Sequence, residues 1–102
     1  MNVITRKRIR DFMAKHPDAA AALSNWYRTA RKAVWRNLQE VRVIYPHADV
    51  ATVASGNKVT IFNVAGTKYR LVSAIHYKAQ RLYVLRILTH ADYSKNAWKA
   101  SL

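Results

Sequence analysis

Two neighbouring β-rich segments constrain the fold of this chain more than any other feature of its sequence. Residues 68–77 and 81–89 are rich in Tyr, Val, Leu and Ile, which favour strands. The short polar stretch Lys78–Gln80 separates them and predicts a turn. Strands joined by so short a connection must pair antiparallel, so the sequence predicts a β-hairpin here.

The length of this turn determines which side chains share a face of the sheet. Successive strand residues point to opposite faces, and a shift of one residue in the pairing exchanges the faces. The odd-numbered turn Lys78–Gln80 places Arg70 opposite Leu88 and Val72 opposite Arg86. We therefore expect Arg70 and Arg86 on one face, whereas an even-numbered turn would separate them.

The first third of the chain predicts a pair of helices. Thr5 can cap a helix that runs to about His16, and Pro17 ends it. Asp18 can then cap a second helix over residues 19–34, whose Ala-rich start has high helix propensity. We expect the two helices to form an antiparallel hairpin.

Shorter elements complete the predicted fold. They are an edge strand over residues 1–4, a helical turn over 34–40, a short extended piece within 47–53, a strand over 58–64, and a helix from His90 or Ala91 to about Ala100. In the last helix, Tyr93, Ala97 and Trp98 can face inward. The order predicts an α+β fold formed by one domain over residues 1–102: an N-terminal helical pair packed on a small antiparallel meander, with a short C-terminal helix.

The charge of the chain indicates its class of partner. Eighteen Lys and Arg oppose five Asp and Glu, which gives a net charge of +13. Such an excess favours a polyanion, because neutralised phosphates release condensed counterions. We rank nucleic acid ahead of an acidic protein partner or a simple solubility charge, and ahead of an anionic membrane surface.

Other features of the composition exclude several classes of site. The chain has no Cys, so disulfides and thiolate metal sites are excluded, and its two Gly cannot build a phosphate-binding loop. It has no apolar run of the ~20 residues that cross a bilayer. The N-terminus lacks the apolar core of a signal peptide, so we expect a cytoplasmic protein. We also expect no cofactor and no membrane contact.

Arg86 is the most informative single residue. It lies within the apolar sequence VLRIL, and an unpaired buried charge is very costly. A structural ion pair is the plainest explanation, but few carboxylates are available to form one. The scarcity favours Arg86 facing a groove that binds an anion.

His90 and Tyr93 follow the second segment of the hairpin with helical i, i+3 spacing, so they share a face. Histidine exchanges protons near neutral pH, and tyrosine can stack on a base or bond a phosphate. Taken alone, both residues fit structural roles equally well, as does His76 beside the turn. No third ligand has the spacing of a metal site, so we expect none.

Several short motifs occur in order through the second half of the chain. They are residues 59–64 followed by Gly66, Tyr69-Arg70-Leu71, residues 82–86, Thr89-His90-x-x-Tyr93, and Lys95. Together they resemble the C-terminal half of HigB-type toxins, within the RelE-like superfamily of mRNA interferases. The resemblance covers the chain from end to end and is weaker in the first half, where the helical pair and Tyr45-Pro46 carry it.

The resemblance implies a RelE-like fold and a toxin that cleaves mRNA, usually on the ribosome. It also implies neutralisation by a HigA-like antitoxin with a helix-turn-helix domain, and operator DNA bound only through the toxin–antitoxin complex. By motif match, the expected catalytic residues are Arg70, Arg86, His90 and Tyr93. The expected RNA-binding residues are Lys58, Lys68, His76 and Lys95.

The chemistry of a metal-free ribonuclease suggests a role for each catalytic candidate. We expect Arg70 and Arg86 to stabilise the phosphorane, His90 to act as general acid or base, and Tyr93 to stack on the base or assist proton transfer. A non-catalytic RNA- or DNA-binding module is the alternative. It explains the charge equally well, but it does not explain Arg86 in an apolar strand beside His90 and Tyr93.

Overall fold

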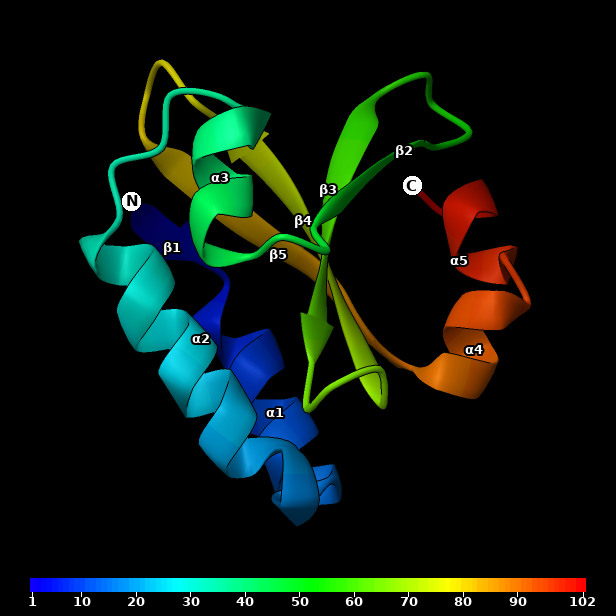
Figure 1. Cartoon of the computed structure of the whole chain (residues 1–102). Coiled ribbons are helices and arrows are strands. Elements are labelled where there is room, and N and C mark those ends of the chain that lie inside the picture. Colours follow the sequence, from blue (N-terminus) through cyan, green and yellow to red (C-terminus); the bar gives the residue numbers. More distant parts are fainter.

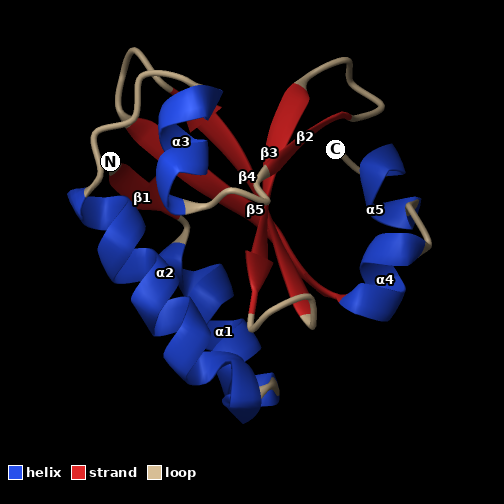
Figure 2. Cartoon of the chain, viewed as in Figure 1, coloured by secondary structure: helices blue, strands red, loops and turns tan.

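The computed structural model describes all 102 residues as a five-stranded mixed sheet with helices on both faces (Figures 1 and 2). The strands lie in the order β1-β5-β4-β3-β2. The elements are β1 (Asn2–Ile4), α1 (Arg6–Lys15), the 3₁₀ turn η1 (Pro17–Ala19), α2 (Ala20–Lys32), α3 (Leu38–Ile44), β2 (Asp49–Thr52), β3 (Lys58–Val64), β4 (Tyr69–His76), β5 (Arg81–Thr89), α4 (His90–Ser94) and α5 (Ala97–Ala100). The predicted α+β class is confirmed.

The sheet is larger than the predicted three-stranded meander. The meander itself is present as β3, β4 and β5, which pair antiparallel. β2 extends it beside β3, and β1 pairs in parallel with the outer edge of β5, with Val3 opposite Leu82. The edge strand predicted over residues 1–4 is therefore confirmed, but the sheet is mixed. Pairing with β1 covers a β5 edge that would otherwise expose unpaired backbone groups.

The β4–β5 hairpin has the predicted pairs but not the predicted turn. His76 pairs with Arg81, so the turn spans residues 77–80 and has an even number of residues. A register shift then follows between Val72 and Ser73 and leaves Leu85 of β5 without a partner. This β-bulge restores the expected pairs, so Arg70 lies opposite Leu88 and Arg86 opposite Val72.

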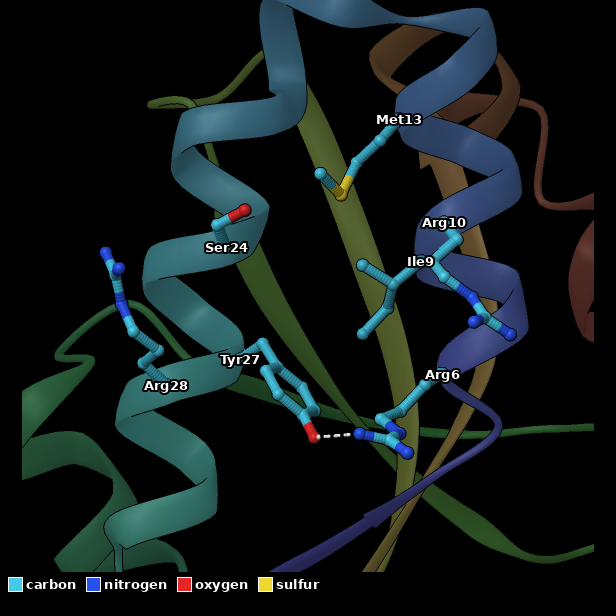
Figure 3. A pocket seen from close by; sticks show the side chains of 7 residues that line it. All are labelled: Arg6, Ile9, Arg10, Met13, Ser24, Tyr27 and Arg28. Atoms are coloured by element: carbon cyan, nitrogen blue, oxygen red, sulfur yellow. Dashed lines mark hydrogen bonds between the residues drawn. The ribbon is translucent and has the colours of Figure 1, made fainter.

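The N-terminal helices form the predicted antiparallel pair, and Arg6 near the start of α1 bonds Tyr27 in the second half of α2 (Figure 3). Neither predicted cap forms. The side chain of Thr5 makes no capping hydrogen bond. Asp18 lies within η1 and accepts hydrogen bonds from Lys68 and Tyr69, since the chain enters α2 through this tight turn and the carboxylate is directed to β4. The second helix is correspondingly shorter than predicted.

The helix predicted over residues 34–40 lies further along the chain. The backbone bends at Arg36 and Asn37, and α3 begins at Leu38. The Oδ1 atom of Asn37 accepts a hydrogen bond from the Glu40 amide at 3.0 Å. Asn37 is therefore a side-chain cap that the sequence pattern did not identify, and it sets the start of α3.

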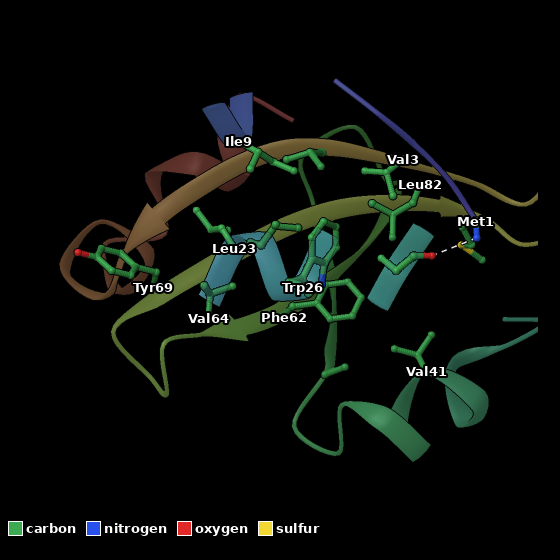
Figure 4. Close-up of a cluster of buried hydrophobic side chains, with 14 of the residues drawn as sticks. Met1, Val3, Ile9, Leu23, Trp26, Val41, Phe62, Val64, Tyr69 and Leu82 are labelled. Atoms are coloured by element: carbon green, nitrogen blue, oxygen red, sulfur yellow. Dashed lines mark hydrogen bonds between the residues drawn. The ribbon is translucent and has the colours of Figure 1, made fainter. Parts of the chain in front are cut away.

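The main core lies between the sheet and helices α1–α3 (Figure 4). Phe62 of β3 is fully buried and contacts Trp26 of α2 edge to face, with ring centroids 5.4 Å apart. The Phe62 ring also contacts Trp35 and Tyr45, at 6.1 and 5.3 Å. These aromatic contacts join α2, the bend before α3 and the sheet into one layer.

The second face of the sheet carries a smaller core under α4 and α5, formed by Val53, Val59, Ile61, Val72 and Trp98. The predicted continuous C-terminal helix is broken, because Asn96 has a left-handed φ of 60° between α4 and α5. Trp98 is buried and Tyr93 half-buried, as expected. The expectation for Ala97 is wrong, since the break turns it to solvent. No helix in the structure has the length and apolarity to span a membrane.

Candidate active site

Arg70 and Arg86 lie on the second face of the sheet, where the bulge gives them the same orientation. Arg70 is directly opposite Leu88, two residues along β5 from Arg86, so the arginines are diagonal neighbours on adjacent strands. Bulges change the direction of side chains beside functional sites, and this one compensates for the even-numbered turn. The folded hairpin thus places on one face of the sheet two arginines that are distant in sequence.

Neither guanidinium pairs with a carboxylate. Arg70 donates through Nη1 to the carbonyl oxygens of Thr67, at 2.5 Å, and Tyr69, at 3.4 Å. Arg86 donates to the Leu85 carbonyl oxygen at 2.7 Å and to Ser101 Oγ at 3.4 Å. Neutral acceptors hold the side chains but leave both charges uncompensated. The remaining N–H groups can donate to the oxygens of a phosphate.

α4 begins with His90 and positions Tyr93 against Arg70. The helix begins directly after β5, and the His90 amide donates to the Lys68 carbonyl oxygen at 3.0 Å. Thr89 caps the helix by accepting from the Asp92 amide at 3.2 Å. The imidazole of His90 is exposed and forms no hydrogen bond with the protein. It is therefore available to a ligand.

The ring of Tyr93 is already in contact with two neighbours. The guanidinium carbon of Arg70 lies 5.2 Å from its centroid. The Trp98 ring stacks on it with centroids 5.5 Å apart. Since these contacts occupy the ring, we expect Tyr93 to act through its hydroxyl, which has no protein partner. The interactions also fix the position of Arg70.

The expected RNA-binding residues lie in three different places. Lys95 is exposed at the end of α4, beside the site. Lys68 directly precedes β4, and its side chain pairs with Asp18 of η1. Lys58 and His76 line a hollow of about 350 Å³ at the far end of the sheet, together with Leu102. The structure therefore groups Lys95 with the catalytic candidates, directs the side chain of Lys68 to Asp18, and separates Lys58 and His76 from the candidates.

The Lys68–Asp18 pair perturbs the groups around it. Hydrogen bonds from Lys68 and then Tyr69 lower the pKa of the Asp18 carboxyl. The bond to Asp18 raises the pKa of Lys68 in turn. Burial, followed by the bond to Asp18, raises the pKa of Tyr69. This cluster joins η1 to the start of β4 and so supports the strand that carries Arg70.

Two residues near the arginines were missed by the sequence analysis. Asn63 pairs opposite Arg70 and lines a hollow of about 370 Å³ with His47 and Thr67, large enough for part of a nucleotide. The predicted turn at residues 65–66 could have identified Asn63, because it sets the β3–β4 register. Ser101, which bonds Arg86, gave no such signal, because the break at Asn96 is needed to place it. No group of three or more potential metal ligands occurs in the structure.

Comparisons with known proteins give a consistent result. Residues 19–96 match the family model described as HigB_toxin, RelE-like toxic component of a toxin-antitoxin system. The chain is 26% identical over 93 residues to the mRNA interferase toxin HigB of Escherichia coli (strain K12), covering 91% of this chain and 88% of that protein. It is 27% identical over 95 residues to mRNA interferase HigB of Escherichia coli O6:H1, covering 93% and 90%. The matched regions include the arginines, His90 and Tyr93.

Proposed function

The chain belongs to the HigB toxin family, the RelE-like toxic component of toxin–antitoxin systems, and we propose that it is an mRNA interferase, a metal-independent endoribonuclease. The observation that carries this proposal is the pair of arginines on one face of the sheet, without carboxylate partners, next to His90 and Tyr93. Relatives across most of the chain are named for the same activity.

In this mechanism, Arg70 and Arg86 bind the scissile phosphate and stabilise the charge of the phosphorane. Their diagonal arrangement places two planar, permanently charged donors on one face of the sheet. The backbone carbonyls and Ser101 hold them before RNA arrives, so little reorganisation is needed when charge develops.

His90 and Tyr93 serve the proton transfers. One group must accept the proton of the ribose 2′-hydroxyl, and one must protonate the leaving 5′-oxygen. The exposed imidazole of His90 is of the chemical type that can serve either step. The hydroxyl of Tyr93, whose ring contacts the Arg70 guanidinium, suits hydrogen bonding to a developing oxyanion or assistance to the leaving group.

The finer partners of the chain are part of the same proposal. Cleavage would take place in the cytoplasm, on mRNA held by the translating ribosome, with Lys95 contacting the RNA backbone. Lys58 and His76 would contact a more distant part of the strand, and Lys68 would contribute to the positive field. The cognate antitoxin would be a HigA-like helix-turn-helix protein, and operator DNA would be bound only through the complex.

The second candidate is a nucleic-acid-binding module without catalytic activity. The net charge of +13 favours it as much as it favours a nuclease. It leaves the exposed His90 beside Arg70 and Tyr93 without a role. The nuclease is therefore the better supported function.

Inducible expression of the wild type and Arg86→Ala in a bacterial host tests the proposal. We expect growth arrest and new mRNA 5′-ends for the wild type, and loss of both for the variant. Removal of one hydrogen-bond donor that stabilises the charge of the transition state typically lowers the rate ~100- to 1,000-fold. Normal growth and no new ends with soluble wild-type protein would instead support the binding module.

A further inference from the structure

A groove between α1 and α2 has no role in the mechanism above. It has a volume of about 330 Å³ and is lined by Arg6, Ile9, Arg10, Met13, Ser24, Tyr27 and Arg28. In Figure 3, Ile9 and Met13 extend from α1 toward α2, and Tyr27 extends from α2 to meet them. The hydroxyl of Tyr27 accepts a hydrogen bond from Arg6 at 3.0 Å and so closes one end of the groove. The floor is apolar and fits an aliphatic or aromatic side chain.

The rim of this groove is basic throughout. Arg6, Arg10 and Arg28 line it, and no carboxylate does. Arg28 bonds the neutral Asn25 at 3.1 Å, and Arg6 bonds the hydroxyl of Tyr27. Asp11, the carboxylate of α1, is already paired with Lys7 at 2.8 Å. The chain itself therefore does not neutralise these arginines, and a partner with carboxylates would complement them.

The groove and the candidate active site lie on opposite sides of the sheet. α1 and α2 cover the main core, whereas Arg70 and Arg86 lie on the face that α4 and α5 partly cover. An RNA strand at the arginines does not need the groove. Its apolar floor also matches the side chain of a peptide better than a phosphate backbone.

We propose that the α1–α2 groove binds an acidic, amphipathic segment of the cognate antitoxin. An apolar side chain of that segment occupies the space between Ile9, Met13 and Tyr27, and its flanking carboxylates pair with the rim arginines. The identity of the partner rests on the proposed function, because a toxin of this family has a cognate antitoxin. Binding there leaves the face that carries Arg70 and Arg86 open, so the groove is an anchoring site rather than the site of inhibition.

Matched charge reversals test the groove. Arg10→Glu/Arg28→Glu changes two rim residues, and Arg8→Glu/Lys15→Glu makes the same charge change on exposed residues on the opposite side of α1. Ser24→Trp fills the groove without changing the charge. The antitoxin is identified as the protein whose co-expression restores growth, and its affinity for each purified chain is measured by calorimetry. We expect the rim double variant and Ser24→Trp to weaken binding at least about tenfold, and the control at most about twofold.

A second probe makes the result independent of nuclease activity. The probe is a synthetic helical peptide with Leu at i, i+3, i+4 and i+7 and Glu elsewhere, and its binding to the same chains is followed by fluorescence anisotropy. We expect the same order of affinities even if the wild type proves not to arrest growth. Equal binding of antitoxin and peptide by wild type and rim variant would overturn the inference. It would also be overturned if the rim variant lost affinity for a single-stranded RNA oligonucleotide as strongly as for the peptide, because the groove would then be an RNA surface.

Discussion

The two faces of the sheet are formed by alternate residues of the same strands, yet they satisfy their polar groups in different ways. On the face under α1–α3, the buried hydroxyl of Ser73 donates to the carbonyl oxygen of Thr60 at 2.9 Å, within the core. On the other face, the guanidinium groups of Arg70 and Arg86 are held by neutral acceptors near solvent. The strand hydroxyl on the first face is thus satisfied inside the core, whereas the second face presents charge to a ligand. Substitutions on the two faces should therefore separate stability from activity.

The largest expected effect is on the charged face. We expect His90→Ala/Tyr93→Phe to lower mRNA cleavage ~100- to 10,000-fold with little change in melting temperature, since His90 is exposed and Phe retains the ring packed on Trp98. Cleavage in a translating extract and thermal melting would be measured together. His16→Ala/Tyr83→Phe changes the same residue types outside the site and should keep its activity; it controls for activity only, because His16 stacks on Phe12. Full activity of the first variant would remove both residues from the mechanism.

The next effect is on the helix-covered face. Phe62→Ala should lower the free energy of unfolding by about 3–5 kcal/mol, because Phe62 is fully buried against several aromatic rings. Denaturant unfolding would measure this change. Val43, with 81% of its surface exposed, provides the control, and Val43→Ala should change stability by less than about 0.5 kcal/mol. A similar loss for both variants would contradict the position of the core.

The smallest effect concerns the ion pair at the border between the faces. The pKa of Asp18 is lowered in the folded chain, so its contribution to stability is present above the unfolded value of 3.8 and is lost as pH falls through the folded value. Asp18→Asn should therefore lower the melting temperature slightly at pH 7, and the difference from wild type should vanish below that window. High salt should also reduce the difference, because the pair is exposed. A difference that persists at low pH would assign the effect to packing.

Local signals in the sequence predicted much of this architecture. Strong β propensity and clear turns gave the exact bounds of β3 and β5, and Pro17 gave the end of α1 to within a residue. Caps were less predictable, since Asp18 could satisfy either a helix end or Lys68, and the tertiary contact prevailed. β1 was expected as a strand, but its parallel partner is distant in sequence and no local pattern identifies it.

Within the candidate site, the position of Arg86 was predictable from a single feature of the sequence. Arg86 stood out because charge is rare in an apolar strand, and its position opposite Val72 was expected. That expectation held because the bulge at Leu85 compensated for a turn of the wrong length. A bulge depends on packing of the whole sheet and has no signature in this sequence. The same limit explains why the ion pair between Lys68 and Asp18 was not expected, while the RNA-binding role of Lys68 stays a prediction.

The parallel pairing of β1 with β5 has a consequence for folding of the protein during its synthesis. A chain is made from its N-terminus, so β1 has no partner until residues 81–89 have been synthesised. Closing so long a loop is slow compared with forming a local hairpin. Arg86 belongs to β5, the strand that is synthesised last. A chain that has not reached β5 therefore lacks both the completed sheet and one of the two arginines of the candidate active site. Synthesis itself therefore delays any activity of this protein until residues 81–89 have been translated.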